Sequence, residues 1–139
     1  MTRSILSIIN ILLFSTLLFA AEPPGAVQKA FVGKFPTATK ITWGKENSKE
    51  WEAEFTLNGT AVSANFSNKG IWMETESKIL LSELPAAVSS SITQHYPKYN
   101  IVSVYRIESP ERPITYEADI RYGKTKKEIL VLEDGALKK

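Results

Sequence analysis

Two pairs of acidic residues are the side chains whose spacing is best suited to chemistry. Glu52 and Glu54 alternate with apolar neighbours, and Glu117 and Asp119 do the same further along the chain. Residues two apart in a strand point to the same side of a sheet, so each pair is expected to project together into solvent. Paired carboxylates can hydrolyse glycosidic bonds or bind calcium through oxygen. The simpler interpretation is that they keep the wet side of a sheet soluble.

The other nucleophiles and bases form no catalytic set. His95 is the single histidine and falls at the end of a predicted helix, where a cation interacts favourably with the helix dipole. Ser89, Ser90 and Ser91 fall on the predicted exposed side of that helix, without a base nearby. With one histidine and no cysteine, Ser–His–Asp, Cys–His and ordinary zinc sites lack partners. We therefore expect no catalytic residue, no metal ligand and no cofactor, and a protein that is not an enzyme.

The N-terminus has the pattern of a secretory signal peptide. Arg3 gives a positive start, an apolar run of about 15 residues follows, and Ala20 and Ala21 provide small residues for cleavage. The run is shorter than the roughly 20 residues that span a bilayer as a helix, so no stable membrane span is expected after cleavage. We predict a cleaved signal peptide over residues 1–20 and a periplasmic or secreted protein.

The remaining residues have the size and charge of one small domain. Arg3 is the only charged residue of the signal peptide, so 16 basic and 15 acidic residues remain and the net charge is +1. This balance gives no reason to expect nucleic acid or an anionic membrane as a partner. Because the chain has no cysteine, its core alone must hold the fold, and this favours a bacterial periplasm over a eukaryotic secreted protein.

The chain after the signal peptide uses one pattern twice. Residues 24–27 recur 61 positions later as 85–88, and residues 51–55 recur 65 positions later as 116–120. The second copy therefore has four extra residues, which we place in a loop over 109–113 because it contains two prolines. The predicted organisation is a single domain, residues 21–139, made of two repeats, 24–76 and 85–139, joined by a linker over 77–84.

Each repeat is predicted to be a helix followed by four antiparallel strands. Apolar residues first recur with helical spacing, up to Pro36 or Pro97, and then with a period of two. The fold class is α+β, with both helices on one face of a continuous antiparallel sheet of about eight strands. The second repeat supplies strands over 102–107, 115–122, 126–132 and 136–138. A single cystatin-like or nuclear-transport-factor-like curved sheet is the alternative, and the doubled helix argues against it.

Several segments resemble a known family. The pattern Pro-x-Ala-Val-x-x-x-Phe-x-x-x-Phe-Pro over 24–36, the run Trp51-Glu52-Ala53-Glu54-Phe55 and the turns at 58–59 and 68–70 resemble the putative beta-lactamase-inhibitor-like, PepSY-like family of secreted bacterial proteins. The resemblance implies a sheet like that of the beta-lactamase inhibitory protein, which grips an enzyme with its concave face. PepSY domains are thought of as peptidase-regulating modules. Both analogies imply an extracytoplasmic protein or peptide partner.

We expect a non-enzymatic module that docks its partner on the open face of the sheet. The candidate partner-binding residues are Glu52, Glu54, Thr56, Trp72, Glu117, Asp119 and Arg121. An exposed Trp72 beside acidic residues would be a typical anchor, although its repeat counterpart Leu137 favours a core position. Leu130 and Leu132 either belong to a strand covered on both sides or add an apolar patch to this surface. The alternatives are a small-ligand or metal-ion carrier, a carboxylate hydrolase and a structural envelope protein.

Overall fold

The computed structural model describes residues 21–138, so the predicted signal peptide lies outside the described residues. The chain forms two helices, a short 3₁₀ helix and seven strands. In chain order these are α1 (Gly25–Lys34), β1 (Thr39–Lys45), β2 (Glu50–Leu57), β3 (Thr60–Ser67), β4 (Trp72–Ile79), η1 (Leu81–Glu83), α2 (Ala86–His95), β5 (Asn100–Ser109), β6 (Arg112–Tyr122) and β7 (Thr125–Leu132). Within residues 21–138, no helix has the length and apolar character needed to cross a membrane.

Proline bounds both helices as the sequence predicts. Pro24 and Pro85 precede α1 and α2 with φ of −52° and −56°, values that suit the start of a helix. Pro36 and Pro97 follow each helix by two residues, and proline cannot continue the hydrogen-bond ladder. Each helix is therefore ten residues long and has one buried side.

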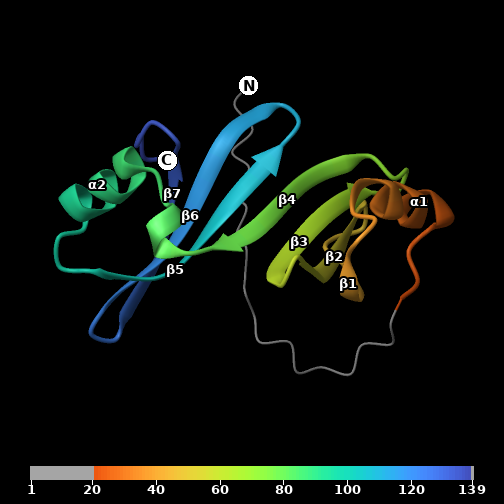
Figure 1. The fold of residues 1–139 in the computed structure, drawn as a ribbon, viewed down its shortest axis with the longest axis horizontal. Coiled ribbons are helices and arrows are strands. Elements are labelled where there is room, and N and C mark those ends of the chain that lie inside the picture. The colour runs from red at the N-terminus through yellow and green to blue at the C-terminus, as the bar shows by residue number, and fades with distance from the viewer. Residues whose placement is uncertain (1–20, 139) are drawn as a thin grey trace.

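All seven strands belong to one antiparallel sheet in the order β1-β2-β3-β4-β5-β6-β7. Figure 1 shows this sheet strongly twisted, with α1 near its first strands and α2 near its last. One row of cross-strand partners runs from Phe55 through Val62, then on to Tyr116 and Val131. Residues of one row point to the same side of a sheet. Phe55 and Val131 are core residues of the two ends, so α1 and α2 cover the same face, which we call the helix face.

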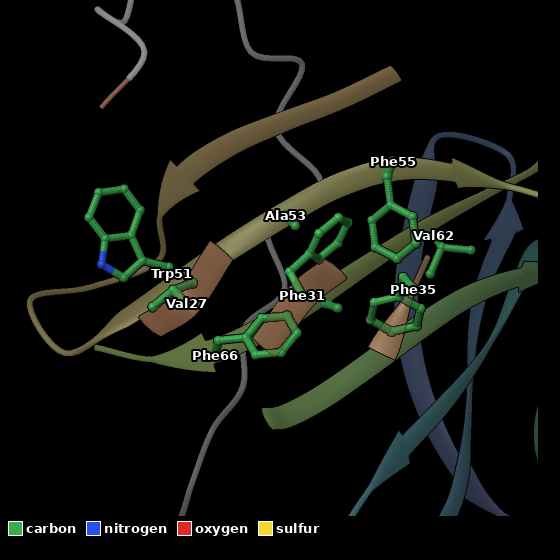
Figure 2. Close-up of a cluster of buried hydrophobic side chains, with 9 residues drawn as sticks. Val27, Phe31, Phe35, Trp51, Ala53, Phe55, Val62 and Phe66 are labelled. Atoms are coloured by element: carbon green, nitrogen blue, oxygen red, sulfur yellow. The ribbon is translucent and has the colours of Figure 1, made fainter. Parts of the chain in front are cut away.

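The buried apolar residues form two clusters on the helix face. Figure 2 shows the first, where Phe31 of α1 lies against β2 and β3 and its ring centroid is 5.0 Å from that of Phe55. The second cluster packs Val88 and Ile92 of α2 on β5, β6 and β7. The predicted stripe on the first helix is confirmed, because Val27 and Phe31 are 0 % and 2 % exposed.

The sequence overestimates the number of strands and misplaces two boundaries. Residues 136–138 do not form an eighth strand, since only an isolated bridge joins Leu137 to Val131. Within the predicted 77–84 linker, residues 77–79 belong to β4 and pair with β5. The predicted 109–113 loop is also shorter than expected, because β6 begins at Arg112. These strands extend further because each finds a neighbour in the continuous sheet.

Each helix rests on a glycine of a turn. A Cβ atom added at Gly70 would lie 2.4 Å from the carbonyl oxygen of Ala26 in the first turn of α1. At Gly135 it would lie 2.7 Å from the carbonyl oxygen of Ala87 in α2. Both glycines have positive φ, 78° and 91°, so they combine an unusual backbone conformation with a close approach. These two contacts fix the distance between each helix and the sheet.

Replacing these glycines by alanine should destabilise the protein more than a turn conformation alone requires. Gly59 also has positive φ but has open space around its Cβ position, so Gly59→Ala is the matched control. We expect Gly70→Ala and Gly135→Ala to lower the free energy of unfolding by about 1 to 3 kcal/mol more than Gly59→Ala, the usual cost of overpacking. Urea unfolding of the three variants measures this difference. An equal loss of unfolding free energy in all three variants would show that the contacts of Gly70 and Gly135 with the helices do not add to the cost.

Candidate functional site

The side of the sheet opposite the helices gathers acidic side chains from four strands, and we call it the acidic face. Strand alternation and cross-strand register place on it the carboxylates of Glu52, Glu54, Glu74, Glu76, Glu117, Asp119 and Glu128. One row crosses from Glu54 through Ser63 and Glu76, and then through Ile107 and Thr115 to Leu132. The two ends of the molecule thus contribute to a single surface.

Six of the seven predicted site residues lie on the acidic face. The first three, Glu52, Glu54 and Thr56, come from β2, and the other three, Glu117, Asp119 and Arg121, come from β6. The two groups are separated by β3, β4 and β5, so they occupy opposite ends of the face. Arg121 is exposed and donates from Nε to the carbonyl oxygen of Gly123 at 2.8 Å. Its guanidinium therefore supports the turn after β6.

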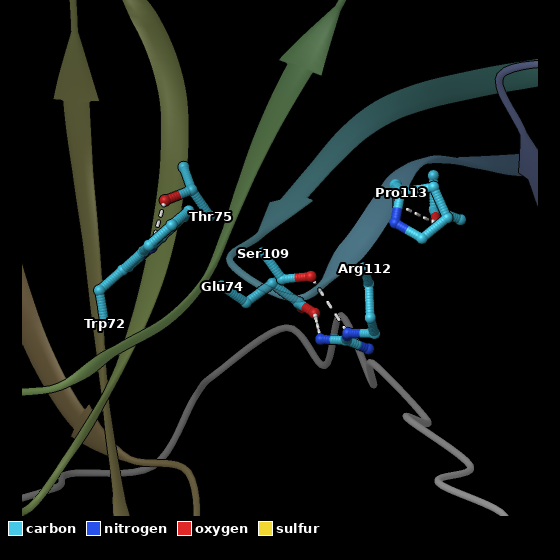
Figure 3. Close-up of polar contacts among 7 residues, drawn as sticks. Trp72, Glu74, Thr75, Ser109, Arg112 and Pro113 are labelled. Carbon is cyan, nitrogen blue, oxygen red and sulfur yellow. Dashed lines mark hydrogen bonds and ion pairs between the residues drawn. The ribbon is translucent and has the colours of Figure 1, made fainter.

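Trp72 does not lie on the acidic face, which corrects the prediction. The pairing of β3 with β4 shifts between Asn65 and Phe66, so that Glu74 and Trp72 end on opposite sides. Trp72 packs against the first core cluster, and its Nε1 donates to Thr75 Oγ1 at 2.9 Å (Figure 3). The Nζ atom of Lys34, in the last turn of α1, lies 3.6 Å from the centroid of the indole. This tryptophan is half-buried on the helix face.

Three carboxylates of the acidic face were not among the predicted site residues. Glu74 and Glu76 lie on β4 and Glu128 lies on β7, where cross-strand pairing brings it opposite Asp119. Arg112, at the start of β6, donates from Nη2 to Glu74 Oε2 at 2.7 Å and thereby links β4 to β6 past the end of β5 (Figure 3). The alternation of Glu74 with Glu76 is a signal in the sequence, whereas the pairing of Glu128 with Asp119 depends on the register between β6 and β7, which the sequence does not give.

Glu117 differs from the predicted solvent-facing carboxylate because it is fully buried. Its side chain is 0 % exposed, and cross-strand pairing places it between Tyr105 and Leu130. Neither carboxylate oxygen has a hydrogen-bond partner within residues 21–138. Glu76 is also buried, with 9 % of its surface exposed. These two carboxylates are thus shielded from water although neither helix covers the acidic face.

Burial and mutual repulsion raise the pKa of several of these carboxyls. Removal from water, as the larger cause, and the charges of Glu76, Glu128 and Asp119 together raise the pKa of Glu117 to about 8. The same two causes raise the pKa of Glu76 to about 7, with burial the larger, and that of Glu52 to about 7. The acidic face therefore holds protons near neutral pH.

One end of the acidic face also has apolar character. Leu130 and Leu132 of β7 are half-buried on it, while Ile129 and Val131 enter the core on the helix face. Leu130 and Leu132 therefore belong to the acidic face rather than to a second core cluster. Tyr105 of β5 is half-buried in the same row as Leu130, on the other side of Glu117. Aromatic and aliphatic side chains next to charges are typical of a surface that contacts another molecule.

Three carboxylates of the acidic face are close enough together to hold a cation. Oxygen atoms of Glu117, Asp119 and Glu128 all lie within 4.8 Å of one another. Within the described residues, His95 Nδ1 lies 2.9 Å from the carbonyl oxygen of Ser91, to which it must donate, so this nitrogen cannot also accept a proton from Ser91 Oγ. The buried Ser91 differs from its predicted exposed position, yet it gains no base.

The chain belongs to the family described as "Putative beta-lactamase-inhibitor-like, PepSY-like", whose model matches residues 49–139. This confirms the resemblance recognised from the sequence. No curated protein sequence matches the chain.

Solved structures with the same fold come from Bacteroides species. A DUF2874 family protein of Bacteroides ovatus is 23 % identical, with a TM-score of 0.78 and 86 % coverage of both chains. A protein of Bacteroides eggerthii described as a putative periplasmic protein is 24 % identical, with a TM-score of 0.76 over 84 % of this chain and 86 % of that one. A BLIP-like protein of Bacteroides fragilis is 23 % identical, with a TM-score of 0.74 over 86 % of this chain and 85 % of that one. At these identities the likeness establishes the α+β fold alone.

The raised pKa of Glu117 predicts that stability falls as pH rises. Between pH 4.5 and about 8 the folded protein holds a proton on Glu117 that the unfolded chain has lost, so raising the pH favours unfolding. We expect a loss of a few kcal/mol across this range, because each unit of pKa displacement corresponds to about 1.4 kcal/mol. Glu117→Gln should flatten this dependence and be more stable than the wild type at pH 8.5.

Urea unfolding from pH 5 to 9 measures the free energy of unfolding of the wild type and of Glu117→Gln, with the exposed Glu54→Gln as control. If the free energy of unfolding changed with pH equally in the wild type and in Glu117→Gln, the raised pKa would not belong to Glu117.

Proposed function

We propose that the protein is an exported, non-enzymatic binding module that docks a protein or peptide partner on the acidic face. The observation that carries the proposal is a sheet whose two helices lie on one side, which leaves the other side free of helices across all seven strands within residues 21–138. Carboxylates extend along this side, and Tyr105 on β5 and Leu130 and Leu132 on β7 add apolar groups among them. A partner with basic groups opposite the carboxylates and an apolar group opposite Leu130 and Leu132 would complement both.

Location and family support an extracytoplasmic protein as the partner. The sequence of residues 1–20 has the features of a cleaved signal peptide, and one structural neighbour is described as periplasmic. The family description refers to a beta-lactamase inhibitor, and one structural neighbour is described as BLIP-like. We infer an inhibitory or regulatory role in the periplasm or outside the cell. Charge complementarity with the acidic face would contribute more to the specificity of binding than the size of the buried interface does.

We infer further that the two ends of the domain arose by tandem duplication, with copies over 24–76 and 85–139. Each end consists of a ten-residue helix followed by an antiparallel meander. The contacts of Gly70 with Ala26 and of Gly135 with Ala87 support equivalence, because both members occupy matching positions of the two repeats. A duplicated sheet would give the partner one long surface rather than two small ones.

Comparative capture from an envelope extract tests the docking surface. The test variant combines Glu54→Lys and Arg121→Glu, which reverses one charge at each end of the acidic face and leaves the net charge unchanged. The control variant combines Lys29→Glu and Ser90→Lys, which introduces the same two residue types at exposed positions of α1 and α2. Quantitative mass spectrometry compares what the immobilised wild type and the two variants retain.

We expect a protein that the wild type and the control variant retain equally and that the test variant loses by at least about tenfold, or about 1.4 kcal/mol of binding free energy. Binding of the purified partner, measured by calorimetry with the same variants, then gives the affinity directly. A partner lost by the control variant and kept by the test variant would place the binding surface on the helices instead.

A further inference from the structure

We propose that Glu117, Asp119 and Glu128 form a binding site for a divalent cation, with a preference for calcium over magnesium. Glu117 and Asp119 are two residues apart on β6 and project to the same side, and Glu128 on β7 is the direct cross-strand partner of Asp119. The site therefore needs only two adjacent strands, and it lies at the β7 end of the acidic face.

The distances between the carboxylates suit a single coordination sphere. One oxygen from each residue lies within 4.8 Å of the other two. Calcium binds oxygen at about 2.3 to 2.6 Å, so two ligands on opposite sides of the ion are separated by roughly 4.6 to 5.2 Å. Magnesium binds at about 2.0 to 2.1 Å, which limits that separation to roughly 4.2 Å and requires a tighter arrangement. The separations therefore fall within the span of one calcium coordination sphere.

The carboxylate of Glu117 is an independent indication that something binds here. It is completely buried, and both of its oxygens lack a hydrogen-bond partner within residues 21–138. A buried polar group without a partner is costly, by about 1 to 3 kcal/mol, and few native structures retain one without reason. The neighbouring Asp119 and Glu128 add like charges on the same side. A divalent cation would satisfy the orphaned oxygens and remove the repulsion in one step.

No basic side chain takes the role of that cation in the described part of the chain. The ion pairs found there are Arg106 with Glu108 and Arg112 with Glu74, and neither includes a member of the site. The site also has a supporting contact, because Ser103 Oγ donates to Asp119 Oδ2 at 2.5 Å and orients this carboxylate. Hydrogen bonds of this kind fix the orientation of a metal-ligating side chain.

The donor set determines the class of metal. Three carboxylates offer only hard oxygen ligands, with neither imidazole nor thiolate, and this suits calcium rather than zinc or copper. Up to six carboxylate oxygens are available, and water would complete the coordination. We expect a dissociation constant of about 0.1 to 1 mM, the range of extracellular calcium modules. The site does not depend on the docking proposal, because it requires no partner protein.

Calorimetric titration of the chelator-treated protein with calcium chloride at pH 8 tests the site. We expect saturable binding of one ion per chain, and a loss of affinity of at least about tenfold in Glu117→Gln, Asp119→Asn and Glu128→Gln. Glu54→Gln, on the same face but at the far end, is the matched control and should bind as the wild type does. Magnesium chloride in place of calcium should give weaker binding.

Terbium luminescence gives a second readout that does not depend on stability. Tyr105 is the cross-strand partner of Glu117, so its ring should sensitise terbium bound at the site. Tyr105→Phe should lower the emission while calcium affinity stays unchanged. Absence of saturable calcium binding up to about 10 mM, well above the expected range, would overturn the proposal. Equal calcium affinity of the wild type and Asp119→Asn would do so as well, and magnesium binding as tight as calcium would overturn the stated preference.

Discussion

Five residue pairs between β4 and β5, from Thr75 opposite Glu108 to Ile79 opposite Val104, join the two ends of the sheet in a single register. Side chains alternate between faces with a period of two, so a shift of one residue at this junction would turn all of β5, β6 and β7 over. The observed register keeps α1 and α2 on one side. The acidic face exists because every carboxylate that alternates with a core residue then points to the other side.

Gathering these carboxylates has an electrostatic consequence that no single residue would have. Burial alone disfavours the charge of Glu117, and the other acids of the face add to the effect. A surface under such repulsion gains from any opposite charge, whether a proton, a metal ion or a basic group of a partner. The docking and cation proposals are therefore two ways in which the repulsion among these carboxylates can be lowered on the same face.

The sequence predicts local features well and the cross-strand environment poorly. Pro24, Pro36 and the alternation around Trp51 identified the helix and strand types, because those signals act within a few residues. Trp72 was placed on the wrong face, since the register shift opposite Phe66 depends on pairing with β3. The burial of Glu117 and its proximity to Glu128 also depend on the register of β6 with β5 and β7, which alternation within one strand does not give. Six of the seven proposed site residues share a face because strict alternation needs no knowledge of the neighbours.

The two apolar clusters lie under different helices at opposite ends of the sheet, and the continuous strand pairing at β4 and β5 connects them (Figure 1). Twist in a β-sheet is set by the angle between neighbouring strands, which varies over tens of degrees among proteins. A different twist angle between β4 and β5 would therefore change the curvature of the acidic face, while the residues of each apolar cluster would keep their neighbours.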